Sequence, residues 1–189
     1  MPVTPLQRSA ALIVALGLLL WNSAAPSARR QAPVPAPADV LGFTPGDDYK
    51  LADFSQIKSY FERLDAASDR VTVSSAGTST EGREMLVAVI SSEANLRELA
   101  RYKDIAQRLA HVRGLSEADA RALAAEGKAI VWIDNGLHAS EVASAQQAMT
   151  LAWRVATDES PEMRAVRDRE ASHGLDTATR VCMRLDLAH

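Results

Sequence analysis

The chain has 189 residues, of which 47% are hydrophobic and 24% are charged, and its formal net charge is −3 at pH 7. This composition fits one globular domain of ordinary size and excludes a polypeptide that is disordered throughout. The slight excess of acidic residues gives no general electrostatic attraction to nucleic acid or to an anionic membrane, so we expect neither as a partner.

Residues 1–28 have the layout of a signal peptide. Arg8 precedes the apolar run "AALIVALGLLLW", which ends in the small-residue stretch "NSAAPSA". The run is short for a membrane span, which favours cleavage after Ala25 or Ala28 over the alternative of an uncleaved anchor. We therefore expect an exported protein, periplasmic or extracellular, with no stable membrane association after cleavage.

Residues 29–47 are rich in Pro and Ala and lack apolar periodicity, which predicts an extended lead-in before a domain that begins near Asp48. Asp53 is a candidate N-cap of the first helix. The apolar positions of that helix fall on one face: Phe54, Ile57, Phe61 and Leu64.

The segment "VTVSSAGTSTEGREMLVAVISS", residues 71–92, predicts two antiparallel strands joined by a turn. Two helices should follow. Asn95 opens a possible capping box for the first, while Ser116 caps a shorter one that Gly127 can end.

The run "AIVWID", residues 129–134, has apolar side chains on both faces, which is typical of a central strand covered by helices on each side. After the turn residues Asn135 and Gly136, an apolar stripe predicts a helix over residues 141–156. The order of strands and helices indicates an α/β fold.

His138 and Glu141 lie between this strand and this helix. Imidazole nitrogen and carboxylate oxygen both bind zinc, and open α/β sheets place ligands at the carboxyl ends of their strands. His173 with Asp176 repeats the spacing without a strand before it, so spacing alone is weak evidence. The residues leave two interpretations open: half of a metal site, or a surface histidine and a glutamate that the helix N-terminus favours.

The order of these segments resembles the N-terminal part of the zinc carboxypeptidase family, the carboxypeptidase A and B-like metallopeptidases, in its bacterial secreted branch. The family's G-x-S-x-E-G-R hairpin here reads "GTSTEGR", residues 77–83, and its H-x-x-E pair falls on His138 and Glu141. The resemblance spans about residues 41–168. It implies an α/β fold with a mixed sheet flanked by helices, of which about three strands are present.

The resemblance also implies the chemistry, which is release of C-terminal residues from a peptide or protein substrate. Zn²⁺ activates a water and polarises the scissile carbonyl, and a separate glutamate acts as general base. His138 and Glu141 would be two of three protein ligands, whereas Glu81 and Arg83 in the hairpin are expected to be structural and to form either a local ion pair or turn contacts. Ser140 stands where digestive members carry an arginine that helps to stabilise the oxyanion.

The family's third ligand and its general base lie beyond the matched stretch, so no catalytic residue is assigned in this chain. Residues 48–169 are expected to be a truncated, inactive part of the catalytic domain. Residues 170–189 bear no likeness to the family, contain the only cysteine, Cys182, and are expected to be disordered. A reading-frame shift or gene-model error near Arg169 is one explanation.

Neither His173 nor His189 is expected to serve as the third ligand, and a single cysteine forms no intramolecular disulfide. With few strands present, residues 129–134 would become an unprotected edge that favours aggregation or partial order.

Two alternative functions remain open. One is a non-enzymatic fragment or weak metal-binding module. The other is a zinc acylase of the aspartoacylase and succinylglutamate desuccinylase type, against which the signal peptide argues. The sequence does not indicate the preferred substrate side chain or the oligomeric state.

Overall fold

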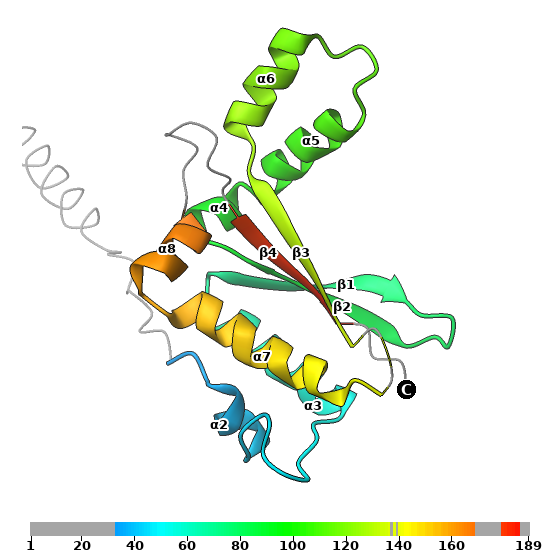
Figure 1. Ribbon diagram of the computed structural model, residues 1–189, viewed down its shortest axis with the longest axis vertical. Coiled ribbons are helices and arrows are strands. Elements are labelled where there is room, and N and C mark those ends of the chain that lie inside the picture. Colours follow the sequence, from blue (N-terminus) through cyan, green and yellow to red (C-terminus); the bar gives the residue numbers. More distant parts are fainter. Residues whose placement is uncertain (1–32, 137, 139, 169–178, 186–189) are drawn as a thin grey trace, which may run out of the picture. The chain divides into compact units, whose positions relative to one another are not determined.

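The computed structural model of the chain describes residues 33–136, 138, 140–168 and 179–185. The predicted signal peptide therefore lies outside the described residues. No helix within them is long and apolar enough to cross a membrane. Figure 1 shows the elements in chain order: α2 (Pro37–Leu41), α3 (Phe54–Ala67), β1 (Val71–Thr78), β2 (Glu84–Ile90), α4 (Glu93–Arg97), α5 (Leu99–Ala110), α6 (Glu117–Glu126), β3 (Ala129–Asn135), α7 (Val142–Thr157), α8 (Pro161–Asp168) and β4 (Thr179–Leu185).

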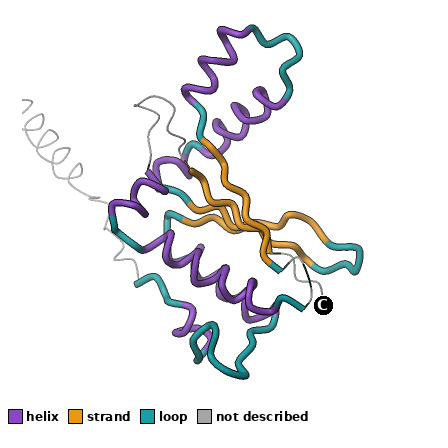
Figure 2. The backbone as a smooth tube through the Cα atoms, in the orientation of Figure 1, coloured by secondary structure: helices purple, strands orange, loops and turns teal. Residues whose placement is uncertain are grey.

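The four strands form one sheet in the order β1-β2-β4-β3. β1 pairs antiparallel with β2, β2 pairs antiparallel with β4, and β3 runs parallel to β4. In Figure 2 the strands run side by side, with helices next to them. The predicted α/β fold with a mixed sheet and flanking helices is thus confirmed.

Helix α3 begins where the sequence predicted. The carboxylate of Asp53 accepts a hydrogen bond from the backbone N–H of Gln56, and the Gln56 side chain accepts one from the N–H of Asp53. These reciprocal bonds satisfy two of the N–H groups that a helix start leaves unpaired. The buried face of the helix is close to the predicted one and consists of Ile57, Tyr60, Phe61 and Leu64.

One face of the sheet packs against α3 and α7. The sheet contributes Val71, Leu86, Ala88 and Ile90 to this core, and α7 contributes Met149 together with small residues, Ala145, Ala148, Ala152 and Ala156. All of these side chains are at most 3% exposed. Alanine at the contact lets the backbone of α7 approach the sheet closely, and burial of the apolar surface is the main source of stability.

Two short segments differ from the sequence prediction. Residues 37–41, expected to be extended, form α2, whose Pro37 is buried. Asn95, expected to cap a helix, is itself inside α4, and the Oγ of Ser92 caps that helix by accepting a hydrogen bond from the Asn95 N–H. Asparagine is a preferred N-cap residue. The side-chain amide of Asn95 instead donates a buried hydrogen bond to the backbone oxygen of Arg167.

The tail contains a strand that the sequence did not predict. Residues 179–185 form β4 between β2 and β3, so part of the segment expected to be disordered has regular structure. The short, charge-interrupted run "TRVCMRL" lacks the apolar length of a central strand. Backbone pairing on both sides places it there, since Val89 pairs with Cys182 and Cys182 with Trp132.

β3 lies at an edge of the sheet rather than in its interior. It pairs with β4 on one side only. Ile130, Val131 and Trp132 are 45%, 39% and 50% exposed. Among the described residues, the prediction that helices cover both faces of this strand is therefore wrong. The predicted exposure of an apolar edge is confirmed.

Arg167 joins three elements at the other side of the core. Its side chain is 1% exposed, and Nη1 donates to the backbone oxygens of Val155 at 2.7 Å and Asp158 at 2.6 Å. The backbone oxygen of Arg167 accepts hydrogen bonds from the Asn95 amide at 2.9 Å and the Ser91 hydroxyl at 3.2 Å. These contacts tie α8 to the end of α7 and to α4.

Replacement of Arg167 by Met should lower the free energy of unfolding by on the order of 3 kcal/mol, because the carbonyls of Val155 and Asp158 would lose a buried, charged donor. Arg164→Met is the matched control, since Arg164 is exposed on the same helix and its ion pair with Glu159 is solvated. Chemical denaturation measures both. Equal stability losses in the two variants would contradict the role assigned to Arg167.

Candidate metal centre

His138 and Glu141 lie in the short connection between the carboxyl end of β3 and the start of α7. Gly136 leaves the strand with a φ of +77°, a left-handed conformation that glycine adopts without a steric cost. Glu141 is the N-cap residue of α7, so its carboxylate lies near the positive end of the helix dipole. The sequence placed both residues in this connection, and the structure agrees.

The two side chains converge. His138 Nδ1 lies 2.9 Å from Glu141 Oε1, and the side chains are 66% and 55% exposed. The backbone N–H of Glu141 donates to the carbonyl oxygen of His138 at 3.0 Å, which closes a tight turn between them. This turn explains why residues three apart outside a helix present their polar atoms to the same point.

Ser144 fastens this connection to α7. Its Oγ donates to the carbonyl oxygen of Glu141 at 2.8 Å and accepts a hydrogen bond from the N–H of Gly136 at 3.0 Å. One hydroxyl therefore bridges the two ends of the segment that carries His138. Sequence reasoning missed Ser144, although a serine in the first turn of a predicted helix is a recognised partner for nearby backbone groups.

The pair fits two positions of a zinc site. Two ligands at about 2.0–2.2 Å from a tetrahedral zinc ion lie roughly 3.4 Å apart, so the atoms would separate by only about 0.5 Å from their present hydrogen bond. Both side chains are open to solvent, which leaves a path for an ion. Within the described ranges, no three His, Cys, Asp or Glu residues form a metal-binding group. His173, Asp176 and His189 lie outside those ranges.

Among the described residues, no hydrogen bond or ion pair joins Ser140, Glu81 or Arg83 to either side chain of the pair. Ser140 is exposed in the same turn. In the hairpin, the N–H of Ser79 donates to the carbonyl oxygen of Arg83 at 2.8 Å, and the Ser79 hydroxyl accepts from the Arg83 N–H at 3.2 Å. The turn is thus closed by contacts of Ser79 with the backbone of Arg83, as one of the two expected arrangements has it. The other, an ion pair between Glu81 and Arg83, is not formed by these two described residues.

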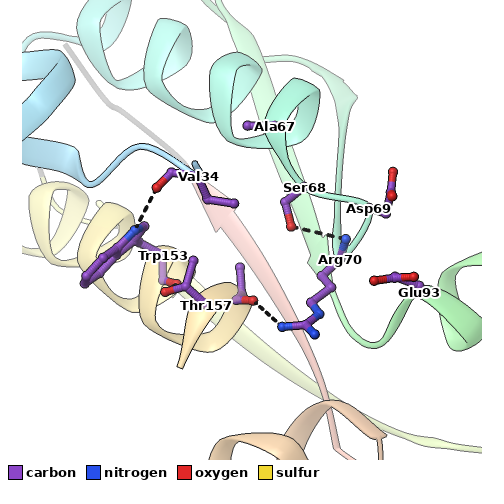
Figure 3. Close-up of a pocket in the computed structure, with 9 residues that line it drawn as sticks. Val34, Ala67, Ser68, Asp69, Arg70, Glu93, Trp153 and Thr157 are labelled. Carbon is purple, nitrogen blue, oxygen red and sulfur yellow. Dashed lines mark hydrogen bonds between the residues drawn. The ribbon is translucent and has the colours of Figure 1, made fainter. Parts of the chain in front are cut away.

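A depression of about 400 Å³ lies around Arg70. Figure 3 shows side chains that line it. The next residue after Arg70, Val71, is aligned with Val131 of β3 across the sheet, through the paired residues of β2 and β4. Val131 is near the start of β3 and His138 follows its end, so Arg70 and His138 are at opposite ends of the sheet. Arg70 Nη1 contacts Glu159 Oε1 at 2.5 Å and the carbonyl oxygen of Ala156 at 3.1 Å. The hydrogen bond from Arg70 lowers the pKa of Glu159. These contacts connect β1 to the end of α7 and are structural.

Replacement of Ser144 by Ala should loosen the connection, because the Gly136 N–H loses its acceptor and the Glu141 carbonyl loses a donor. We expect a loss of stability of about 1 kcal/mol and greater averaging of the His138 ring environment. Thermal unfolding and the imidazole signals in NMR spectra measure the two effects. Ser140→Ala is the control, and an equal effect of that variant would count against a specific role for Ser144.

Comparison with known proteins gives two results. A search of curated proteins finds no match to the chain. Among protein families, the one described as "Zinc carboxypeptidase" matches residues 57–171. The matched segment includes the β1–β2 hairpin, β3, the His138–Glu141 turn and α7. Because this match covers more than half of the chain, the protein belongs to the zinc carboxypeptidase family.

Proposed function

We propose that this chain carries part of the active site of a zinc-dependent metallocarboxypeptidase, a hydrolase that releases C-terminal residues from peptides or proteins. His138 and Glu141 would supply two of the three protein ligands of Zn²⁺. The observation that carries the proposal is the 2.9 Å approach of His138 Nδ1 to Glu141 Oε1 at the carboxyl end of a strand. The match to the zinc carboxypeptidase family supports the choice of metal and reaction.

When bound, zinc supplies an activated water and a Lewis acid that polarises the scissile carbonyl. The chain's own contribution is to hold the ligands. With Nδ1 directed at the metal, the proton of neutral His138 must reside on Nε2. Without metal, Nδ1–H can donate to the Glu141 carboxylate, so binding exchanges that hydrogen bond for a coordinate bond. The Ser144 bridge keeps the backbone turn between the ligands in place during this exchange.

We propose further that the chain alone binds zinc weakly and does not hydrolyse peptides. In the family that it resembles, the third ligand and the general base lie beyond the matched stretch. Two ligands leave half of a tetrahedral coordination sphere to water, and so supply only part of the binding free energy of a complete site. The signal-peptide pattern of residues 1–28 supports export as the location of the protein.

Zinc titration by calorimetry tests the site. We expect a dissociation constant between about 1 μM and a few hundred μM, since two ligands supply about half of the roughly 10–16 kcal/mol of a four-ligand site. The doubly substituted variant, His138→Ala with Glu141→Ala, should lose this binding. Peptidase activity, measured as release of a C-terminal amino acid from a blocked dipeptide, should stay at the level of a protein-free blank.

His111→Ala is the matched control, because His111 is the other histidine among the described residues and is exposed at the end of α5. Equal weakening of zinc binding in that variant would indicate adventitious histidine binding and contradict the proposal. If the chain bound zinc tightly and stoichiometrically and the double variant abolished this binding, His138 and Glu141 would still be identified as ligands. It would show instead that another residue of the chain completes the site, and activity would then be expected.

A further inference from the structure

Asn135 and Gly136 form an Asn-Gly dipeptide at the end of β3, just before the turn that carries His138. Asparagine is a chemically labile residue. The backbone nitrogen of the following residue can attack its side-chain Cγ, and glycine in that position favours the attack because it has no Cβ to hinder it. The dipeptide occurs once in the sequence. The connection between β3 and α7 therefore holds the sequence that is most open to this reaction.

The side-chain amide of Asn135 is loosely held. Its Nδ2 donates to the carbonyl oxygen of Ile133 at 3.4 Å, which is long for a hydrogen bond of this kind. By comparison, Nδ2 of Asn95 donates to the Ser91 hydroxyl at 3.0 Å and to the backbone oxygen of Arg167 at 2.9 Å. Both asparagines are buried, at 3% and 8% exposure. The difference between them thus lies in their hydrogen bonds and in the residue that follows each.

The nitrogen that would attack is held by Ser144. The N–H of Gly136 donates to Ser144 Oγ at 3.0 Å, and this hydroxyl donates to the carbonyl oxygen of Glu141 at 2.8 Å. Attack requires the Gly136 nitrogen to lose its proton. It also requires this nitrogen to turn toward Cβ of Asn135, away from the extended backbone of a strand. Neither change is compatible with the hydrogen bond to Ser144, so the bridge must open first.

We propose that Asn135 is a site of spontaneous deamidation and that the Ser144 hydroxyl sets its rate. When the connection opens locally, solvent base takes the proton of the Gly136 N–H, and the nitrogen attacks Cγ of Asn135. The new C–N bond closes a five-membered succinimide, and the side-chain nitrogen takes up a proton and leaves as ammonia. Water then adds to one of the two ring carbonyls and breaks its bond to nitrogen, which leaves an aspartate or an isoaspartate at position 135.

Either product changes the segment that precedes His138. Isoaspartate carries the main chain through the former side chain and lengthens it by one carbon atom between β3 and the turn. Both products place a carboxylate where the Asn135 side chain is buried, and burial of an unpaired charge destabilises the folded state. Because the conversion is irreversible, its effect accumulates with the age of the molecule. The Ser144 bridge therefore protects the covalent structure of the connection as well as its conformation.

Incubation of the full chain at neutral pH tests the proposal, with conversion at position 135 measured by peptide mass spectrometry and by enzymatic methylation of isoaspartate. Ser144→Ala should convert about fivefold faster than the original chain, which is the factor for a lost hydrogen bond of about 1 kcal/mol. Ser144→Thr retains the hydroxyl and should stay near the original rate. Ser140→Ala is the matched control, because Ser140 is exposed in the same turn. A Ser144→Ala rate no higher than that of this control would overturn the proposal.

Urea separates local opening from global unfolding without any substitution. Local opening exposes little surface, so the rate at position 135 should hardly change at urea concentrations below the unfolding transition. Above the transition the rate should be about tenfold higher or more, because the Gly136 N–H is then always free to react. A rate that follows global unfolding from the lowest urea concentrations would contradict the proposal. So would a folded chain that converts as fast as the unfolded one, or that does not convert while the unfolded one does.

Asn95 provides an internal reference in every sample. The residue after it is Leu96, whose Cβ hinders the attack, and its amide is fixed by hydrogen bonds to Ser91 and Arg167. Conversion at position 95 should therefore stay low in the folded original chain and in Ser144→Ala alike. If positions 95 and 135 accelerated together in Ser144→Ala, the substitution would act through overall stability, and Ser144 would not be a local control of deamidation.

Discussion

The close approach of α7 to the sheet is the constraint on which the rest of the structure depends. Ala148 and Ala152 are fully buried at this contact, and Met149 fills the space between α7 and its neighbours. β3 is a strand of the sheet, and α7 packs against the sheet. The spacing between the sheet and α7 therefore sets the span of the connection that carries His138. A larger side chain at either alanine would lift the helix and with it the Glu141 end of the pair.

Elements with a strong local signal could be predicted from the sequence. α3 has its capping box at Asp53 and a 3.6-residue apolar period, and α6 has a serine before it and Gly127 after it. In such segments local preference and tertiary packing agree. The position of His138 and Glu141 was predictable as well, because the pair follows the apolar run of residues 129–134 and precedes the apolar stripe of α7.

The mistaken predictions arose where tertiary contacts override local preference. Asn95 has the chemistry of a helix cap, yet its amide donates to the backbone of Arg167, a residue far away in the sequence. β4 has little strand signal of its own and depends on two neighbouring strands for its pairing. The hydroxyl of Ser144 bridges two backbone groups that only the folded connection brings together. No single-sequence pattern contains these distances.

The place of β4 has a consequence for the order of folding. β3 has no backbone ladder with the β1–β2 hairpin, and the only strand between them in the described sheet is β4. The hairpin can form by local contacts, but β3 joins the sheet only after a segment remote from β2 along the chain has paired with it. Such high-contact-order steps are slow because loop entropy is lost before the contacts form. The His138 turn, attached to β3, would thus be among the late-formed parts of the protein, with the contacts of α7 holding β3 near the sheet in the meantime.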